Sequence, residues 1–316
     1  MKAAIINKWG SPEVFEIIDN AAIPKPAENQ CLIQVFFSSV NPVDFKHRVG
    51  YHKYILGSPF PISLGYDVCG KVIETGSRVC KFKKGDIVFG DLDKKYGGAL
   101  AGYAVGSENC FALKPDNITS QEAAGFPLAS LTALQALRDK AGLKEGQTVI
   151  INGASGGVGH FALQIAKILG AKTIAVSSSK SKDFVMQFAP DKFIDYTKED
   201  ITKTEIKADV FFDVAGKLSF PKCLQVLNKK GIYISTLPRP KIVLHKLLQV
   251  FTKGKKVKTL LRKHSYSDMQ LLAKWIKEGK LKVEIDKVFS LKNIADAHRY
   301  AELEHTKGKN IIEITP

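Results

Sequence analysis

The pattern of apolar and polar residues changes character part-way along this chain of 316 residues. Before residue 120, short apolar runs of strand length alternate with turn residues, for example at 31–37, 68–74 and 86–90. Many short strands separated by Gly, Pro and Asn predict a compact β-rich, barrel-like unit.

After residue 118 the pattern predicts strands that alternate with helices. The segment Thr119-Ser-Gln-Glu122 matches a capping box, which begins a helix. An apolar-periodic helical run follows at 131–141. We expect strands at 148–152, 173–176, 193–195, 209–214, 231–236, 282–289 and 310–314, and helices at 158–169, 182–188, 220–227, 267–278 and 295–304. This alternation predicts crossover units and a parallel sheet, hence an α/β fold.

The composition is that of an ordinary globular protein, with 45% apolar and 25% charged residues. No apolar run approaches the roughly 18 residues that span a membrane. The first residues predict an opening strand and not a signal peptide, so we expect a cytoplasmic protein. The five cysteines have no zinc-ribbon spacing and their number is odd, which predicts reduced thiols.

The net charge of +16 is compatible with nucleic acid, an anionic membrane or an acidic substrate as partner. The sequence has no helix-turn-helix, finger or RNA-recognition signature, so we do not expect nucleic acid. The segment 238–264 carries nine Lys/Arg and no acidic residue, with apolar residues between them. Three interpretations stay open for it: a lid, an amphipathic patch on an anionic membrane surface, or a solvated helical insertion.

The segment Gly153-Ala-Ser-Gly-Gly-Val-Gly159 lies between an expected strand and an expected helix. This is the context of a dinucleotide-binding turn, although alanine stands where the first glycine is expected. Glycines let backbone N–H groups approach a pyrophosphate closely, and the helix N-terminus favours the anion. A glycine turn without a ligand is the alternative. The expected cofactor contacts are Ala154, Ser155, Gly156, Gly157, Val158 and Gly159.

The residues after the next strand predict which nucleotide is bound. NAD-binding proteins place Asp or Glu there to hold the ribose hydroxyls. This chain has Ser177-Ser-Ser-Lys-Ser-Lys182, with no carboxylate before Asp183. Hydroxyl and ammonium donors suit a 2′-phosphate, so we expect NADP(H) held by Ser178, Ser179 and Lys182. The choice between Lys180 and Lys182 stays open, as does a merely solvated loop.

Five segments together carry a family resemblance. They are Asn41-Pro-Val-Asp-Phe-Lys-His-Arg-Val-Gly50, Leu64-Gly-Tyr-Asp-Val-Cys-Gly-Lys-Val72, Pro127-Leu-Ala-Ser-Leu-Thr-Ala-Leu-Gln135, the turn at 152–159, and Lys307-Gly-Lys-Asn-Ile-Ile312. Over nearly its whole length the chain resembles zinc-free quinone and enone oxidoreductases of the medium-chain dehydrogenase/reductase superfamily. The resemblance implies a GroES-like catalytic domain at 1–120 and 265–316, a Rossmann domain at 121–264, an active site in the cleft, and a homodimer.

The resemblance also shows which zinc ligands are missing. Gly65-Tyr66-Asp67 stands where zinc-dependent relatives have Gly-His-Glu, and the region 38–41 lacks their catalytic cysteine. The residues 91–103 contain no cysteine, so the structural zinc lobe is absent as well. Zinc needs four ligands, or three and a water. We therefore expect no metal.

Without a Lewis acid the substrate must already be electrophilic, which favours a quinone or an α,β-unsaturated carbonyl. The resemblance implies that Asn41 and Thr132 contact the nicotinamide region and that Tyr51 lines the substrate mouth. The alternatives are a turn residue, helix packing and plain surface, respectively. Lys46 and Arg48 would add positive potential near the cleft, although a solvated surface position is the preferred interpretation for Lys46. Asp44 and Asp67 would brace loops. Further cofactor contacts implied by the resemblance are Tyr196, Ala215, Leu237, Lys309 and Asn310.

The function that the sequence favours is therefore NADPH-dependent, zinc-independent reduction of a quinone or enone. A second hypothesis is a reductase of lipid-derived alkenals or ketols at a membrane surface. A third, from a different class, is a non-catalytic nucleotide-binding protein, which the net charge of +16 keeps open.

Overall fold

The computed structural model describes residues 1–236, 254–260, 262–303 and 306–314. These residues form two compact units. The first unit combines Met1–Ala129 with His264–Pro316, and the second unit is Ser130–Lys263. Each unit is described by itself below.

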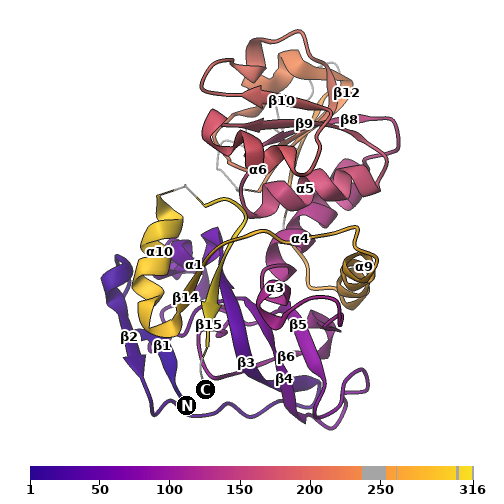
Figure 1. The fold of residues 1–316 in the computed structure, drawn as a ribbon. Coiled ribbons are helices and arrows are strands. Elements are labelled where there is room, and N and C mark those ends of the chain that lie inside the picture. Colours follow the sequence, from indigo (N-terminus) through magenta and orange to yellow (C-terminus); the bar gives the residue numbers. More distant parts are fainter. Residues whose placement is uncertain (237–253, 261, 304–305, 315–316) are drawn as a thin grey trace. The chain divides into compact units, whose positions relative to one another are not determined.

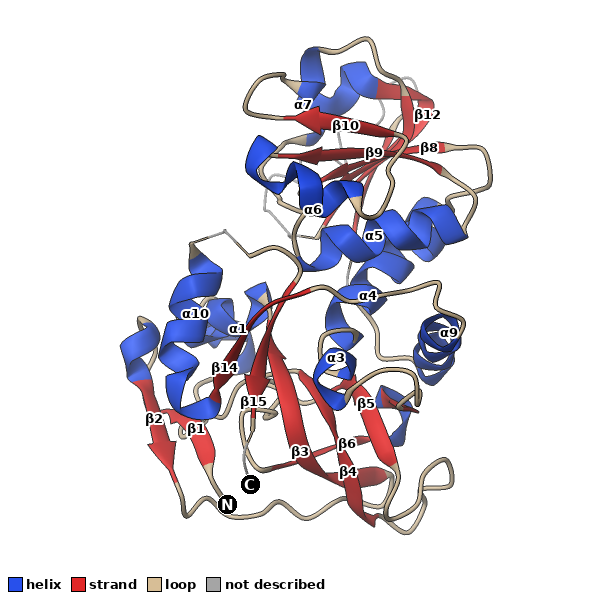
Figure 2. Cartoon of the chain, viewed as in Figure 1, coloured by secondary structure: helices blue, strands red, loops and turns tan. Residues whose placement is uncertain are grey.

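The first unit is built mainly on antiparallel strands, with one parallel pair at the edge of its larger sheet (Figures 1 and 2). Its described residues form a two-stranded sheet and a seven-stranded sheet of order β14-β15-β3-β4-β5-β7, with β6 also paired to β3. The strands are β1 (Ala3–Ile6), β2 (Phe15–Ile18), β3 (Gln30–Val40), β4 (Asp67–Thr75), β5 (Ile87–Asp91), β6 (Tyr103–Ser107), β7 (Phe111–Leu113), β14 (Ile285–Ser290) and β15 (Lys309–Glu313). The expected β-rich first part is confirmed.

Strand β3 is the centre of this sheet, because β4, β6 and β15 all pair with it. The antiparallel pairing with β15 joins the two sequence segments of the unit. In this register Asn310 lies opposite Val40 and Ile311 lies opposite Ser39. The tail of the chain therefore reaches the end of β3, where the residues from Ser38 to Asn41 begin the next helix.

Helices cover the sheet of the first unit. They are α1 (Pro42–Arg48), α2 (Lys53–Leu56), α3 (Ser120–Ala123), α9 (Tyr266–Lys277) and α10 (Ile294–Glu302). The capping box of α3 is present: the N–H of Glu122 donates to Thr119 Oγ1, and the N–H of Thr119 donates to the Glu122 carboxylate. Helix α3 packs on β3 and β4, so the first unit continues past residue 120, up to Ala129.

The second unit has a parallel sheet whose six described strands follow the order β10-β9-β8-β11-β12-β13. They are β8 (Thr148–Asn152), β9 (Lys172–Ser177), β10 (Lys192–Asp195), β11 (Ala208–Asp213), β12 (Leu227–Ser235) and β13 (Lys256–Thr259). Numbered within the unit, the order is 3-2-1-4-5-6, the order of dinucleotide-binding sheets. The order reverses between β8 and β11, and ligands of such sheets bind beyond the strand ends at that point.

The helices of this region are α4 (Pro127–Leu134), α5 (Gly157–Ile168), α6 (Lys182–Met186) and α7 (Phe220–Cys223). Helix α4 continues as a π-helical segment, Gln135–Ala141. The helix expected at 220–227 is shorter than predicted. After a 3-10 turn, β12 already begins at Leu227, because Leu227 pairs with Ala208 of β11.

Strand β13 lies inside the basic segment 238–264, where the sequence analysis expected no strand. It pairs in parallel with β12, so at these four residues the helical interpretation is wrong. Val257 is buried whereas Lys256 is exposed, and a single buried apolar residue among lysines gives little periodic signal. Residues 237–253 and 261 lie outside the described residues.

A buried histidine in α10 makes the stability of the first unit depend on pH. The His298 ring is fully buried and packs edge-on against Phe15. Neither ring nitrogen has a hydrogen-bond partner among the described residues. Burial, and then the Arg48 charge, lower the pKa of His298 from 6.5 to about 3. The folded protein therefore favours the neutral ring.

We predict that His298→Leu flattens the acid side of the stability curve. The contribution of the neutral ring is present above pH 6.5 and is lost as the pH falls toward 3. Between pH 6.5 and 4.5 the wild type should lose about 2–3 kcal/mol more unfolding free energy than the variant. Urea unfolding at a series of pH values measures this difference, and parallel curves for the two proteins would contradict it.

Candidate functional site

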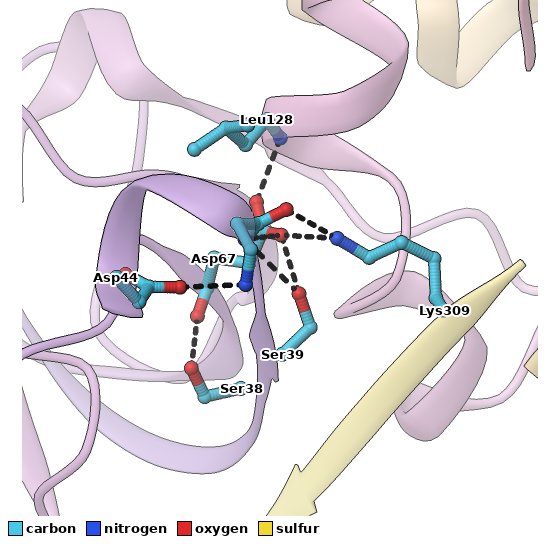
Figure 3. Close-up of polar contacts among 7 residues, drawn as sticks. Ser38, Ser39, Asp44, Asp67, Leu128 and Lys309 are labelled. Carbon is cyan, nitrogen blue, oxygen red and sulfur yellow. Dashed lines mark hydrogen bonds and ion pairs between the residues drawn. The ribbon is translucent and has the colours of Figure 1, made fainter. Parts of the chain in front are cut away.

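A buried polar cluster, called here the Asp67 network, lies where β3 ends and β4 begins (Figure 3). Its members come from distant parts of the sequence but belong to the first unit. They are Ser38, Ser39, Asn41, Asp44, Asp67, Leu128 and Lys309.

The carboxylate of Asp67 is the acceptor at the centre of this network. Its Oδ2 accepts hydrogen bonds from Ser39 Oγ at 2.5 Å, Asn41 Nδ2 at 2.8 Å and Lys309 Nζ at 3.2 Å. Its Oδ1 accepts from the backbone N–H of Leu128 at 2.7 Å. Leu128 stands in the first turn of α4, where a carboxylate also interacts favourably with the helix dipole.

Asn41 has both a backbone role and a side-chain role. It is the N-cap of α1, and its backbone N–H donates to Asp44 Oδ2 at 2.7 Å. Its side-chain Oδ1 accepts from Lys309 Nζ at 2.5 Å, while Nδ2 donates to Asp67. The side chain is 2% exposed. Asn41 is thus more than a turn residue before Pro42, because its amide joins two buried charged groups.

Asp44 is buried beside this pair. Burial is the largest cause that raises its pKa to about 7, and the Asp67 charge acts in the same direction. The backbone N–H of Asn41 and the Lys309 ammonium oppose the rise. Asp44 therefore changes charge near neutral pH. Its carboxylate also accepts from the Asn41 backbone N–H, and this hydrogen bond holds the start of α1.

The two tail residues that the resemblance assigns to the cofactor lie in the interior of the first unit. Lys309 is 2% exposed and contacts Asn41 and Asp67. Asn310 is also buried, and its Nδ2 donates to Thr306 Oγ1 at 2.9 Å. Their cofactor role stays a prediction.

Two expectations for the segment after Asn41 have different outcomes. Arg48 was expected to add positive potential near the cleft, which is wrong: its side chain is 1% exposed, pairs with Glu302, and donates from Nε to the carbonyl of Gly10. The Glu302 carboxylate neutralises the charge of the buried Arg48 guanidinium. Tyr51 is 64% exposed and lies edge-on against His52, so its substrate role stays a prediction.

In the second unit the glycine turn connects β8 to α5. The backbone N–H groups of Gly153 and Ala154 both donate to the carbonyl of Val176, at the end of β9. Gly153 has φ +90°, and a Cβ there would lie 3.0 Å from the backbone of Ala215. Ala154 is the departure from the expected motif, whereas Gly153, which directly follows the strand, is the residue that supplies the positive φ.

The other glycines of the turn differ in the space around them. A Cβ on Gly159 would lie 2.1 Å from the carbonyl oxygen of Gly153, so only glycine lets α5 pack this closely. A Cβ on Gly156, the N-cap of α5, would meet only that same oxygen, at an ordinary 3.6 Å. The N-terminal end of α5 therefore has room next to the backbone of Gly156.

A second buried carboxylate, Asp213 at the end of β11, organises the neighbouring loop, and the sequence analysis did not single it out. Asn152 Nδ2 donates to Asp213 Oδ1 at 2.8 Å, and Tyr233 donates its hydroxyl to Oδ2 at 2.9 Å. Burial and then the Asp213 charge raise the pKa of Tyr233 above its usual range. The carbonyl of Asn152 accepts from the N–H of Ala215, which places Ala215 beside the glycine turn. Its contact with the cofactor stays a prediction.

The loop expected to recognise a 2′-phosphate is tied to the turn by hydroxyl groups. Ser177 Oγ donates to Ser155 Oγ at 2.9 Å. The segment then forms a 3-10 turn, Ser179–Ser181, and α6 begins at Lys182. Ser179, Lys180 and Lys182 are exposed, whereas Ser178 is half-buried. Hydroxyl and ammonium groups are therefore displayed next to the turn.

The end of β10 lies beside this loop. The backbone N–H of Tyr196 donates to the carbonyl of Ser177, and the Tyr196 side chain is 58% exposed. The neighbouring Asp195 is a carboxylate that the sequence argument did not consider. Hydrogen bonds from Thr197 lower its pKa. The backbone N–H and the hydroxyl of Thr197 both donate to Asp195 Oδ1, and these bonds hold the strand end.

Two further candidates complete the set. Thr132 is buried on α4, in the second unit. Leu237 lies outside the described residues. Within the described part of the chain, no group of three or more His, Cys, Asp or Glu residues could hold a metal ion. In the same part, no helix combines the length and apolar character needed to cross a membrane.

Comparisons with known proteins agree with this architecture. A family model described as "Alcohol dehydrogenase GroES-like domain" matches residues 27–116, and one described as "Zinc-binding dehydrogenase" matches 189–312. A "2-methylene-furan-3-one reductase" of Solanum lycopersicum is 35% identical over 100% of this chain and 80% of its own length. The chain belongs to the medium-chain dehydrogenase/reductase superfamily.

One further relative and one solved structure are similar to this chain over its whole length. The "NADPH-dependent alkenal/one oxidoreductase, chloroplastic" of Arabidopsis thaliana is 33% identical over 100% of this chain and 80% of its own length. The solved structure of the quinone oxidoreductase from Coxiella burnetii has a TM-score of 0.91 and 31% identity, covering 100% of this chain and 99% of that one. The expected fold, a GroES-like sheet domain with a Rossmann-type domain, is confirmed.

We predict opposite outcomes for two alanine substitutions in the glycine turn. Gly159→Ala should lower the unfolding free energy by about 1–3 kcal/mol, because its Cβ overlaps the Gly153 carbonyl. Gly156→Ala should leave the melting temperature nearly unchanged, because its Cβ has room and its φ of −80° suits alanine. Thermal unfolding of both variants checks this, and equal losses of stability would show that the turn packs differently.

Proposed function

We propose that the protein is an oxidoreductase that transfers a hydride from NADPH to a quinone or an α,β-unsaturated carbonyl, without zinc. The proposal is carried by one observation: Ser179, Lys180 and Lys182 are exposed beside the glycine turn. The hydrogen bond between Ser177 and Ser155 holds their loop next to this turn. The printed names of the relatives support the same chemistry, since they include an NADPH-dependent alkenal/one oxidoreductase and a quinone oxidoreductase.

The second unit fits the cofactor at the turn. A pyrophosphate would lie against the backbone of Gly156, Gly157 and Val158, where α5 begins and where the helix dipole favours an anion. The 2′-phosphate would be held by Ser178, Ser179 and the lysines at 180 and 182. Tyr196 would border the adenosine, whereas Ala215 and Thr132 would border the nicotinamide half. The cofactor supplies a hydride to a carbon of the substrate.

The first unit supplies hydrogen-bond donors for the negative charge that grows on the substrate oxygen as the hydride arrives. In this proposal the Asn41 amide is the main donor, and Tyr51 contacts the substrate from the exposed segment after α1. Preorganised donors of this kind are the largest contribution to catalysis of many such reactions. A proton from solvent completes the reduction.

The contacts of the Asp67 network support a zinc-independent reaction. Four donors already occupy the Asp67 carboxylate, one of them the Lys309 ammonium. The neighbouring Tyr66 donates its hydroxyl to the carbonyl of Lys95 at 2.5 Å. Residues engaged in this way are poor metal ligands, because a metal would have to displace a buried cation.

A second enzyme hypothesis is the reduction of lipid-derived alkenals or ketols at a membrane surface, with quinones as incidental substrates. The name of the alkenal/one oxidoreductase relative favours it. Membrane contact through the basic segment 238–264, a cytoplasmic location and a homodimer are all proposals. Edge strand β13, which lies in that segment, presents lysines beside β12.

One assay tests the proposed function. NADPH absorbance is followed with a panel of quinones, enones and alkenals, with and without a chelator, and then with NADH. We expect oxidation of NADPH that the chelator does not change. We also expect kcat/KM to fall by about tenfold or more with NADH, since the 2′-phosphate contacts are charge-assisted. Separate Lys180→Ala and Lys182→Ala variants identify which lysine meets the phosphate, by their loss of NADPH preference.

The contrary results are distinct. No oxidation with any acceptor would exclude the enzyme and favour a nucleotide-binding protein. Equal rates with NADH would show that the loop after β9 does not read the phosphate. Loss of activity with the chelator would show that a metal is required.

A further inference from the structure

Lys309 is a buried ammonium whose two described hydrogen bonds both go to side chains of the Asp67 network. Its Nζ lies 2.5 Å from Asn41 Oδ1 and 3.2 Å from Asp67 Oδ2. A charge in the protein interior is costly unless it is paired and hydrogen-bonded. The fully buried Asp67 provides the opposite charge, so the position of Lys309 is fixed by the first unit alone.

This ion pair determines how the Asn41 amide is oriented. A half-turn of an amide exchanges its oxygen and nitrogen at little steric cost, so the neighbours decide between the two states. Here Nδ2 faces the Asp67 carboxylate at 2.8 Å, whereas Oδ1 faces the Lys309 ammonium. The rotated amide would point its oxygen at a carboxylate and its N–H groups at a cation. Two charge-assisted hydrogen bonds would become two repulsive contacts.

The pair also leaves a defined donor on Asn41. One amide hydrogen is engaged with Asp67, and the other has Ser39 Oγ at 3.4 Å, a long and weak contact. The Ser39 hydroxyl directs its own hydrogen to Asp67 at 2.5 Å. The described residues therefore hold the second amide hydrogen only weakly, and in the proposed reaction this is the hydrogen that Asn41 donates. Because a cation holds the amide oxygen, the amide is polarised and its N–H groups are stronger donors.

We infer that Lys309 is the positioning residue of the Asn41 amide and not a contact of the cofactor phosphates. The inference rests on the proposed function, in which the Asn41 amide donates to the substrate oxygen. Lys309 acts through Asn41 and touches neither reactant. Its loss should therefore impair turnover and leave NADPH affinity in place.

A double-mutant cycle tests this role. Lys309→Met, Asn41→Ala and the double variant are compared for kcat and, by fluorescence titration, for the Kd of NADPH. We expect Lys309→Met to lower kcat by about 10- to 100-fold with a Kd within about twofold of wild type. The double variant should be no slower than Asn41→Ala alone. Multiplied effects, or a raised Kd with unchanged kcat, would overturn the inference.

Control variants separate positioning from stability. Lys81 forms an ion pair with Glu108 at 2.7 Å in the same unit, outside the Asp67 network. Lys81→Met should lower the melting temperature slightly and leave kcat unchanged. If Lys309→Met does not fold, the pair Asp67→Asn with Lys309→Met removes both charges together. This pair should fold and still show the reduced kcat, whereas wild-type kcat would contradict the inference.

Chemical rescue is a further test, because added amine should restore kcat only if the Lys309 ammonium positions Asn41 and not if Lys309 merely stabilises the fold. In Lys309→Ala, added ethylammonium or propylammonium should raise kcat in proportion to the concentration of protonated amine. The Lys81→Ala control should not respond. Absence of rescue in a folded Lys309→Ala variant, together with an additive cycle, would count against positioning.

A measurement without turnover distinguishes failure of this inference from failure of the proposed function. The side-chain amide signals of Asn41 are assigned in nitrogen-15 NMR spectra by their loss in Asn41→Ala. In the wild type they should exchange slowly and be well dispersed, and in Lys309→Met they should move toward free-amide values. Unchanged signals would refute the positioning role even if no substrate were found. A wild type that oxidises no NADPH, with signals that move as expected, refutes only the proposed function.

Discussion

The buried carboxylate of Asp67 is the interaction on which the arrangement of the first unit's polar interior depends. It accepts hydrogen bonds from the end of β3, from β15 and from the start of α4. A carboxylate without water must find such donors within the protein, because its desolvation is otherwise uncompensated. The three elements are therefore required to meet at one point, and Asn41, for which we propose a role in the reaction, lies there.

In the second unit the desolvation of Asp213 is compensated in a similar way. This carboxylate is also fully buried, and it accepts from Asn152, Tyr233 and the backbone N–H groups of Gly216 and Leu218. The loop after β11 is thus shaped beside the glycine turn, where the strand order reverses. In both units a buried carboxylate at a strand end positions part of the candidate set, Asn41 and Lys309 at Asp67 and the loop after Ala215 at Asp213.

The sequence predicted the local features of the protein well. The strand at 148–152 has the predicted bounds, and the capping box at Thr119 and Glu122 is present. These features depend on residues within a few positions of one another, so periodicity and spacing reveal them. Strand β13 was missed, because its pairing with β12 and not its own lysine-rich sequence makes it a strand.

The partners of the charged residues could not be predicted in the same way. Lys309 and Asp67 are 242 positions apart, and Arg48 and Glu302 are 254 apart. Nothing in either local sequence states which carboxylate a cation will meet, because the pairing of β3 with β15 and the packing of α1 with α10 bring them together. The resemblance located Lys309 near the site, but only the contacts show what it holds.

The pairing of β3 with β15 has a consequence for synthesis of the chain. A ribosome completes residues 130–263, the whole second unit, before it makes the strand that closes the first one. Domains generally fold as units while the chain emerges. The second unit therefore has all its described strands early, whereas the end of β3, residues 37–40, must wait without its β15 partner, and Asp67 without its cation, until β15 has been translated.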